Sequence, residues 1–301
     1  MNTKNTFDFN KLSEFTQQLI SKEFVDFLQS RIDYSFETIR DDYNDYIEQA
    51  EFGLRLLSKL DLENKRILEI GSGIGVLTAW LLMNDADVIG IEPSALGFHF
   101  HQDVFTAIWD YFQLPKDKVF DKTAEEIEED DLGKFDLIFS VNVIEHIPKE
   151  NILLAFSKMA NVLNEEGIMY HHCPNYTIPF EPHYGLPLVP FFPQLTGKLA
   201  GVNKEGLWCS VNFITLPQVR KIADTLKLDV LFEKGIMAES FRRLDYDVEF
   251  SKRHPALTKI NGLLKLSGVI KTLESLPPSL CTPMTFILHK PANHLQIKGF
   301  I

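Results

Sequence analysis

The sequence has few cysteines and no excess of positive charge. Only three cysteines occur among 301 residues, and the odd number and wide spacing of Cys173, Cys209 and Cys281 argue against a disulfide framework. The 42 acidic residues outnumber the 30 lysines and arginines, so the net charge is −12. A phosphate-backbone partner needs a cationic surface. We therefore expect no nucleic-acid partner.

Long apolar runs are also missing. No uninterrupted stretch reaches the roughly 18 apolar residues that a membrane-spanning helix needs, and residues 1–8 lack the apolar segment of a signal peptide. The apolar content of 45% and the charged content of 24% are typical of soluble globular proteins. We expect a cytoplasmic protein without membrane association.

Residues 66–82 follow the pattern of a strand, a tight turn and a helix. The apolar run 66–70 stops at Gly71, Gly73 and Gly75, and a second apolar segment follows through Trp80. Glycines at such a turn let a ligand approach the backbone N–H groups at the N-terminus of the helix. The pattern predicts a ligand site.

The spacing of Glu69, Gly71, Gly73 and Gly75 resembles the first motif of the class I S-adenosylmethionine (SAM)-dependent methyltransferases. The competing dinucleotide fingerprint, G-x-G-x-x-G/A, needs a small residue where this chain has Val76. An acid inside the turn also suits the ammonium and sulfonium groups of SAM better than a pyrophosphate. The resemblance implies that SAM is the cofactor, S-adenosylhomocysteine the product, and Ser72 a further contact in the turn.

Three further segments agree with the resemblance. Glu92 ends a second apolar run, 21 residues after Gly71, where parallel α/β sheets place the carboxylate that accepts the ribose hydroxyls. In the family, the residues after a third strand edge the adenine, and the strand end at 141–148 is similar to that of many small-molecule methyltransferases. The resemblance therefore implies six further cofactor contacts: Glu92, Pro93, Ala124, Glu125, Asn142 and Val143.

From residue 66 to residue 172 the pattern alternates between strand and helix, as in a doubly wound parallel sheet. We expect an α/β fold with a seven-stranded, mostly parallel, Rossmann-like sheet. Its strands are predicted near 66–70, 87–91, 118–121, 135–140, 167–172, 228–234 and 284–290, with the clearest helices over 95–112 and 150–163. We expect residues 1–60 to form a helical cap and residues 61–301 the SAM-binding domain, with a helical insertion at 236–283.

The segment 174–215 is rich in proline and aromatic residues and begins just after the fifth predicted strand. A loop of this length inside a compact domain is usually functional, so we predict a lid or acceptor-binding insertion. The alternative is that its aromatic residues form a satellite core with the N-terminal helices. Thr215 is predicted to cap the helix that follows.

Residues 257–271 combine apolar positions at helical spacing with three lysines, Lys259, Lys265 and Lys271. Such a helix can lie on a membrane surface, but a helix that packs against the core is the commoner outcome. We expect the second.

Two histidines are candidates for general base. An alcohol or phenol acceptor of a methyl group benefits from a base near neutral pH, and imidazole suits that task. His146 follows the fourth predicted strand, and His183 lies in the predicted lid. Each has a structural alternative: His146 can cap the turn before Pro148, and His183 can hydrogen-bond within its own loop.

A metal site is not required by the sequence. His171 and Cys173 would face one side of a strand and His172 the other, and no metal-binding spacing accompanies them, so a structural role is favoured. Glu145, His146 and Glu181 could contribute to a cation site for a diol acceptor, but we predict no metal.

The leading hypothesis is transfer of a methyl group from SAM to a hydroxyl of a small-molecule or saccharide-type acceptor. A non-catalytic SAM-binding or scaffold protein is the first alternative, because cofactor motifs do not prove turnover. An NAD(P)-dependent oxidoreductase is the second, which Val76 disfavours. The sequence says nothing of the oligomeric state.

Overall fold

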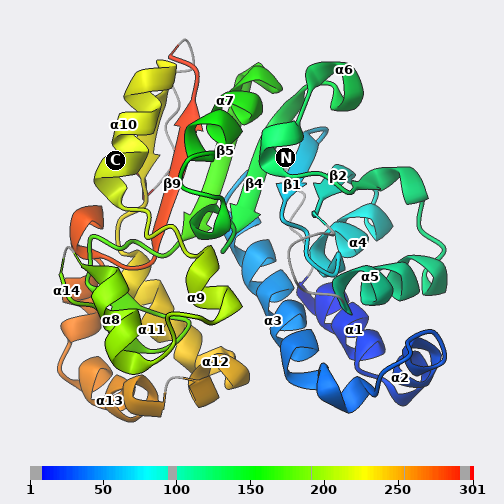
Figure 1. Cartoon of the computed structure of the whole chain (residues 1–301), viewed down its shortest axis with the longest axis horizontal. Coiled ribbons are helices and arrows are strands. Elements are labelled where there is room, and N and C mark those ends of the chain that lie inside the picture. The colour runs from blue at the N-terminus through cyan, green and yellow to red at the C-terminus, as the bar shows by residue number, and fades with distance from the viewer. Residues whose placement is uncertain (1–8, 94–99, 191, 254, 292–298) are drawn as a thin grey trace, which may run out of the picture. The chain divides into compact units, whose positions relative to one another are not determined.

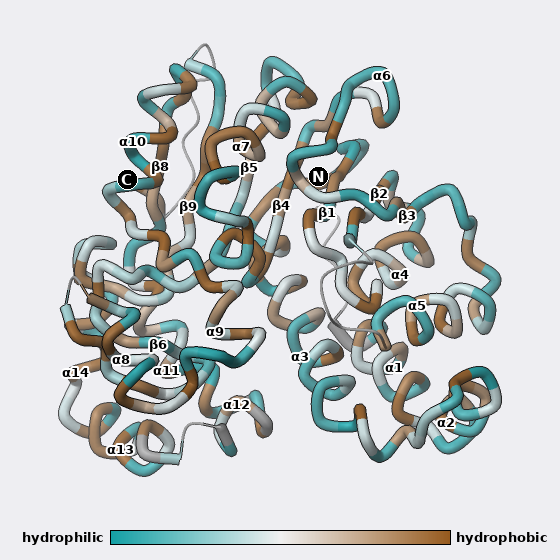
Figure 2. The backbone as a smooth tube through the Cα atoms, in the orientation of Figure 1, coloured by the Kyte–Doolittle hydropathy of each residue, from teal (hydrophilic) through white to brown (hydrophobic). Residues whose placement is uncertain are grey.

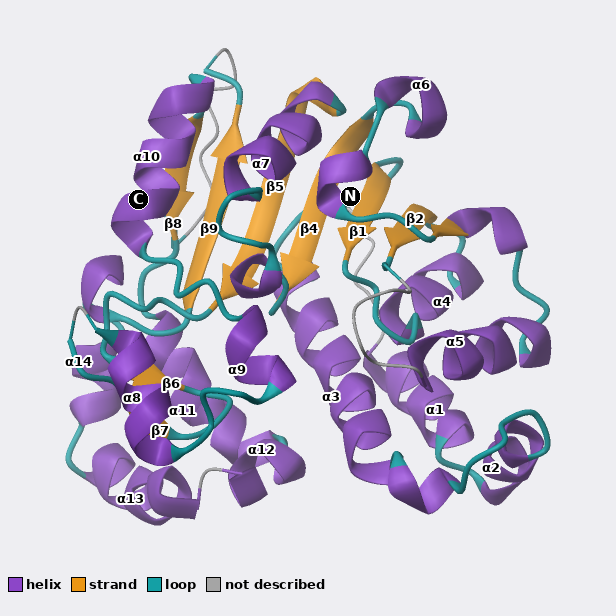
Figure 3. Cartoon of the chain, in the orientation of Figure 1, coloured by secondary structure: helices purple, strands orange, loops and turns teal. Residues whose placement is uncertain are grey.

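The computed structural model describes residues 9–93, 100–190, 192–253, 255–291 and 299–301. By its contacts the chain divides into two compact units, Met1–Phe139 and Ser140–Ile301. Its strands form a seven-stranded sheet with the order β3-β2-β1-β4-β5-β9-β8 (Figures 1 and 3). The predicted fold class is thereby confirmed. The division into a cap of residues 1–60 and a domain of residues 61–301 stays a prediction.

The first unit starts with helices and continues as alternating strands and helices. Strand β1 pairs in parallel with β2 and β4, and β2 pairs in parallel with β3. Apolar runs buried on both faces are typical of such parallel strands. The elements are α1 (Phe9–Leu19), α2 (Lys22–Gln29), η1 (Phe36–Thr38), α3 (Arg40–Leu57), β1 (Arg66–Ile70), α4 (Val76–Met83), β2 (Asp87–Ile91), α5 (Phe100–Tyr111), η2 (Lys116–Lys118), β3 (Val119–Phe120), η3 (Ala124–Glu126), α6 (Glu129–Leu132) and β4 (Phe135–Val141). Residues 95–99 of the predicted helix 95–112 lie outside the described residues.

In the second unit, β9 runs antiparallel to both β5 and β8, which makes the sheet mostly rather than wholly parallel. The elements that follow β4 are η4 (Ile144–His146), α7 (Ile152–Asn161), β5 (Leu163–Cys173), β6 (Phe180–Glu181), β7 (Leu186–Pro187), α8 (Pro193–Ala200), α9 (Gly206–Ser210), α10 (Leu216–Leu226), β8 (Asp229–Phe232), α11 (Ile236–Tyr246), α12 (Val248–Arg253), α13 (Pro255–Leu266), α14 (Val269–Leu273), η5 (Pro278–Leu280) and β9 (Met284–His289). Thr215 caps α10 as predicted, in a capping box with Gln218.

The segment 174–215 is more ordered than a loop. It contains the hairpin of β6 and β7 and the helices α8 and α9. Tyr176, Leu188, Trp208 and Val211 form a buried apolar cluster in it, with other side chains of the same segment packed against them. The predicted satellite core therefore exists, but the members of this cluster all come from the segment itself, not from the N-terminal helices.

The expected core-facing helix over 257–271 is wrong in two respects. The left-handed backbone of Gly268, at φ +74°, separates α13 from α14. Hydrophobic residues recur along α13 (Figure 2), yet Leu263 is 68% exposed and Leu266 is 88% exposed. The spacing predicted a helix correctly but not what covers it, because burial depends on the packing of the neighbouring helices. None of the described helices is long and apolar enough to cross a bilayer.

Candidate active site

The turn after β1 uses most of its own backbone N–H groups. The N–H groups of Gly71 and Ser72 donate to the carbonyl oxygen of Ile91, the last residue of β2, at 2.8 and 3.0 Å. The N–H group of Gly75 donates to the Ser72 carbonyl at 2.8 Å. The Gly73 N–H donates to Oε2 of Glu92 at 2.9 Å. A phosphate cradle relies on N–H groups that point at the ligand. A turn whose donors are bound within the protein is a poor site for a pyrophosphate.

Aromatic rings pack over this turn where glycine leaves space. At Gly73, with φ +56°, a Cβ atom would lie 2.7 Å from Cε1 of Tyr46. At Gly75, with φ +79°, it would lie 2.5 Å from the ring of Trp109. Both positions therefore need glycine for the close approach as well as for the backbone conformation. The rings come from α3 and α5, so three segments of the first unit build the turn.

Two buried polar groups stand beside the turn. Glu69 in β1 is 8% exposed and accepts a hydrogen bond from the Thr78 hydroxyl. Burial raises the pKa of the Glu69 carboxyl to about 7, although the Thr78 hydrogen bond opposes the rise. The hydroxyl oxygen of Ser72 is buried and has no hydrogen-bond partner among the described residues. A buried polar atom of this kind calls for a partner that the protein itself does not supply.

The other cofactor residues predicted in the first unit follow β2 and β3. Glu92 and Pro93 come directly after β2, and Oε1 of Glu92 lies 3.4 Å from Nδ1 of His101. Ala124 and Glu125 form the start of η3, with Ala124 buried and Glu125 half-buried. These residues follow the carboxyl ends of neighbouring parallel strands, where ligands bind in open α/β sheets.

The remaining predicted residues lie in the second unit. Asn142, at φ +56°, and Val143 link β4 to η4. Asn212 at the end of the segment 174–215 fixes η4, since its Nδ2 donates to the Ile144 carbonyl at 2.7 Å and to the Ile147 carbonyl at 2.8 Å. The segment 174–215 therefore positions the residues that follow β4.

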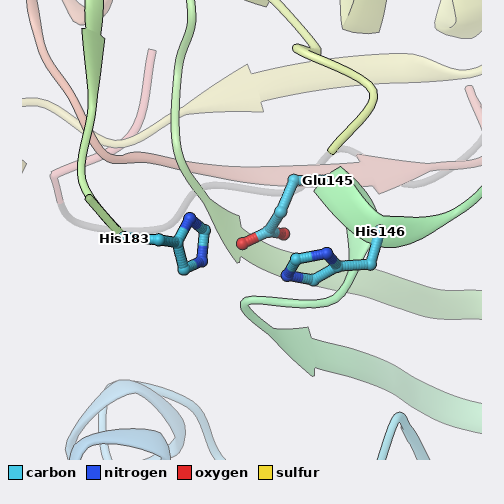
Figure 4. Close-up of side chains that lie close together, drawn as sticks. All are labelled: Glu145, His146 and His183. Carbon is cyan, nitrogen blue, oxygen red and sulfur yellow. The ribbon is translucent and has the colours of Figure 1, made fainter. Parts of the chain in front are cut away.

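Glu145, His146 and His183 come together in this unit. Figure 4 shows the carboxylate and the two imidazole rings directed toward a shared space. One nitrogen of each ring and one carboxylate oxygen all lie within 4.8 Å of one another, and the ring centroids are 5.4 Å apart. The sequence grouped Glu181 with Glu145 and His146. In the structure the third member of the cluster is His183, and Glu181 is hydrogen-bonded to His183 outside the cluster.

Each of the two histidines uses Nδ1 for a hydrogen bond outside the cluster. Nδ1 of His183 donates to Oε1 of Glu181 at 2.6 Å. Nδ1 of His146 lies 2.8 Å from Oγ of Ser210, whose hydroxyl donates to the Leu207 carbonyl. Oγ of Ser210 therefore accepts a hydrogen bond from the Nδ1–H group of His146. The ring nitrogen of His146 that carries a lone pair is then Nε2. In both rings, Nε2 is the nitrogen on the side of the cluster.

Burial controls the charges in the cluster. It lowers the pKa of His146 to about 4, so this imidazole is neutral at pH 7, and it raises the pKa of Glu145 to about 7. Burial also acts to raise the pKa of Glu181, but the hydrogen bonds from His183 and the backbone N–H of Tyr184 bring it below its ordinary value. Neither carboxylate oxygen of Glu145 has a hydrogen-bond partner among the residues that the structure describes.

The histidines of β5 belong to the core. Nδ1 of His171 lies 2.8 Å from Oγ of Ser140, and Nδ1 of His172 lies 2.8 Å from Oγ1 of Thr285. Cys173 is fully buried. These contacts agree with the structural role expected for the three residues.

A comparison with protein-family models assigns the chain. The model for a methyltransferase domain matches residues 43–224, which is more than half of the sequence. The chain belongs to the methyltransferase family. With the observed strand order, this match confirms the prediction of a class I SAM-dependent methyltransferase, and SAM as its cofactor follows from the family.

This methyltransferase is 30% identical to an uncharacterized protein of Mycobacterium tuberculosis over 200 residues, which cover 62% of the chain and 65% of the relative. The match thus spans less than two thirds of the length of that relative. It is also 30% identical to a ubiquinone biosynthesis O-methyltransferase of Acinetobacter baumannii over 92 residues, 29% of the chain and 35% of the relative.

Solved structures of similar shape include a cyclopropane synthase of Mycobacterium tuberculosis. The sequence identity is 17%, the TM-score is 0.49, and the match covers 95% of this chain and 98% of the other. The O-methyltransferase of a multienzyme of Brevibacillus brevis, in complex with S-adenosyl-L-homocysteine, is 16% identical with a TM-score of 0.46, covering 87% of this chain and 78% of the other.

The first unit of the methyltransferase fits its cofactor. The buried hydroxyl of Ser72 has no partner in the described part of the chain, Glu69 is a buried carboxyl that a cation would stabilise, and Glu92 is an acceptor after β2. Four backbone donors of the turn, those of Gly71, Ser72, Gly73 and Gly75, are already bonded within the protein. This donor and acceptor set suits a cationic nucleoside.

Sequence reasoning missed several residues of the methyltransferase that shape these sites. They are Tyr46 and Trp109 over the glycine turn, His101 beside Glu92, and Asn212 beneath η4. No local pattern marks them, because each contacts a segment outside its own helix or loop. The separation is 9 residues for His101 and Glu92 and 68 residues for Asn212 and Ile144.

Proposed function

We propose that this methyltransferase transfers the methyl group of SAM to a hydroxyl oxygen of a small-molecule or saccharide-type acceptor. The observation that carries the proposal is the pair of imidazoles, His146 and His183, each with Nδ1 bonded elsewhere and Nε2 on the side of the cluster. Two such groups suit an acceptor that must lose a proton. A thioether acceptor, which has no proton to lose on methylation, would not need them.

Most of the cofactor contacts are assigned to residues of the first unit. Glu69 holds the ammonium end of SAM, Ser72 and the glycine turn hold the methionine portion, and Glu92 accepts the ribose hydroxyls. Ala124 and Glu125 flank the adenine, and Asn142 and Val143 after β4 complete the set. This assignment uses the buried carboxyl and the unpartnered hydroxyl of the turn.

The acceptor is assigned to the second unit. His183 is the better candidate for the base, because the buried carboxylate of Glu181 fixes its orientation and stabilises the imidazolium that forms. The acceptor O–H donates its proton to Nε2 of His183 as the oxygen attacks the methyl carbon. The bond from that carbon to sulfur breaks in line, and S-adenosylhomocysteine leaves.

Calorimetric titration with SAM, S-adenosylhomocysteine and NAD tests the cofactor assignment. We expect micromolar binding of the two sulfur compounds and none of NAD. Binding of NAD alone would support an oxidoreductase, and binding of SAM without turnover on any acceptor would support a scaffold protein.

A panel of hydroxylated acceptors, with S-adenosylhomocysteine formation as readout, tests the reaction. His183→Ala should lower kcat by about 10²–10⁴-fold, the usual range for loss of a general base, while the Kd for SAM stays the same. An unchanged kcat would reject His183 as an activating group.

A further inference from the structure

Glu145 has no role in a reaction that uses the histidines as bases. Its side chain is fully buried, and both carboxylate oxygens lack a hydrogen-bond partner among the described residues. A buried carboxyl group in this state costs several kcal/mol unless another group compensates it. The backbone N–H of Asn212 donates to the Glu145 carbonyl at 2.8 Å, and the Asn212 side chain donates to the Ile144 carbonyl. These bonds fix the backbone from which the buried Glu145 side chain projects.

We infer that Glu145, His146 and His183 bind a divalent transition-metal cation, which coordinates the hydroxyl oxygen of the acceptor. The inference rests on the proposed function, since it states how the acceptor of that reaction is held and activated. Two imidazoles and one carboxylate supply three ligands, and further positions stay open for the acceptor.

The geometry needs only a small adjustment. The three ligand atoms lie within 4.8 Å of one another, whereas atoms bound to a common ion at about 2.1 Å lie about 3–3.5 Å apart. The most distant pair of ligand atoms therefore needs to close by at most about 1.3–1.8 Å. His183 is on the partly exposed hairpin loop between β6 and β7, where such a movement costs little.

The surroundings of both histidines match those of metal ligands. A metal-bound histidine usually donates its second ring N–H to a carboxylate or another oxygen, which fixes the tautomer and the ring orientation. The Nδ1–H group of His183 donates to Glu181, and the Nδ1–H group of His146 donates to Ser210. Both rings are thus held by oxygens outside the cluster, with Nε2 on its inner side.

The ligand types select the cation. Imidazole suits Zn²⁺, Fe²⁺ and Co²⁺, whereas Mg²⁺ and Ca²⁺ prefer sites made of oxygen ligands. Coordination lowers the pKa of a bound hydroxyl, as it does for water. The cation would lower the pKa of the acceptor hydroxyl, so that its proton could leave to solvent. His146 and His183 would then hold the cation, and this role would replace the proton transfer to His183 in the mechanism proposed above.

The first test uses Co²⁺ and Zn²⁺ with protein stripped by a chelator. We expect binding at a ratio of one cation per chain, followed by the visible absorption of Co²⁺ and by calorimetry for Zn²⁺, with Mg²⁺ unable to compete. Glu145→Gln, which keeps the shape of the side chain, and His183→Ala, on the exposed loop, should each weaken Zn²⁺ binding at least tenfold. Glu181→Gln should weaken it by about 10–100-fold, as loss of an outer-shell partner does.

Cys209→Ser is the matched control, because Cys209 is exposed and a surface thiol can bind Zn²⁺ by itself. Its affinity for Zn²⁺ should equal that of the unaltered protein. Thermal unfolding checks that each variant is folded. Unchanged Zn²⁺ affinity in both Glu145→Gln and His183→Ala, or no binding by the unaltered protein, would overturn the inference.

Titration of the stripped protein with SAM separates this inference from the proposed function. If SAM binds and the chelated enzyme still methylates a hydroxylated acceptor, the cation site is refuted and the reaction stands. If turnover is lost on chelation and restored by one equivalent of Zn²⁺ or Co²⁺, the cation site is supported. If SAM does not bind, the proposed function itself fails.

Discussion

Among single residues, Glu69 is buried, and it is the residue proposed to bind the ammonium group of SAM. Its carboxyl is surrounded by protein and bonded to the Thr78 hydroxyl, and burial brings its pKa to about 7. A positive ligand placed against it favours the ionised form. Cofactor binding and proton release are therefore linked at this residue.

We predict that SAM binding releases a proton below pH 7. The folded protein without SAM holds the proton on Glu69 at pH 6, and the ammonium of SAM displaces it, so affinity should rise with pH by up to about tenfold per unit until pH passes 7. Calorimetry at pH 6 in buffers of different ionisation enthalpy measures the number of protons released.

In Glu69→Gln the proton release should disappear and the affinity should fall by about 1–3 kcal/mol, the scale of a charge-assisted hydrogen bond. Glu92→Gln, which also removes one carboxylate near the turn, is the control. SAM binding to this variant should still release the proton, because Glu69 is intact. If release is the same in Glu69→Gln, the ammonium lies elsewhere.

At the scale of elements, the glycine turn depends on helices that precede and follow it. Gly73 and Gly185 both have left-handed backbones, at φ +56° and φ +62°, but their surroundings differ. A Cβ at Gly73 would meet the Tyr46 ring of α3, whereas nothing lies within 4 Å of a Cβ at Gly185. The pair separates backbone strain from packing.

Gly185→Ala should lower the free energy of unfolding by about 1–2 kcal/mol through backbone strain alone. Gly73→Ala should lower it by about 1–3 kcal/mol more, because the Tyr46 ring must move. Only Gly73→Ala should also weaken SAM binding. Urea unfolding and calorimetry measure the two effects; equal losses of stability would mean that the Tyr46 contact costs nothing to displace.

The side chain of Asn212, in the segment 174–215, bonds to the backbone of the 3₁₀ helix η4 and of the residue after it. Asn212→Ala removes two hydrogen bonds to carbonyls of residues 144 and 147. We expect kcat to fall at least tenfold, since Glu145 and His146 lose their fixed positions, while the Kd for SAM changes little. Asn203→Ala, in the same segment but not bonded to η4, should keep the activity in steady-state kinetics; equal rates in both variants would deny Asn212 a positioning role.

The elements differ in how far the sequence predicts them. Apolar runs predicted β1, β2 and β4 closely, because strands buried on both faces are recognisable from their own residues. The predicted helix at 257–271 is interrupted at Gly268, and its exposed leucines were expected in the core. Of the cluster, Glu145 and His146 were grouped correctly, but Glu181 was chosen instead of His183, since only the folded hairpin decides which of the two faces η4.

At the scale of the whole molecule, most of the proposed cofactor contacts and the proposed acceptor residues belong to different units. The glycine turn, Glu69, Glu92 and the start of η3 all belong to residues 1–139, whereas His146, His183 and their supports belong to residues 140–301. Most of the cofactor contacts are thus assigned to one unit, and the activation of the acceptor to the other. Binding of SAM and binding of the acceptor should therefore slow hydrogen exchange in different segments of the chain.

Hydrogen exchange with and without SAM tests this division. A ligand at 100 times its Kd stabilises the state that binds it by about 2.7 kcal/mol, so backbone amides that exchange by opening of that state should slow by about 100-fold. We expect the largest slowing at residues 66–75 and 87–93, because the amides of the turn are bonded to β2 and to Glu92. NAD at the same concentration is the control and should slow none of them. If the largest effect of SAM fell within 180–215 instead, the cofactor would have to be reassigned to the second unit, and the buried carboxyl of Glu69 would need another explanation.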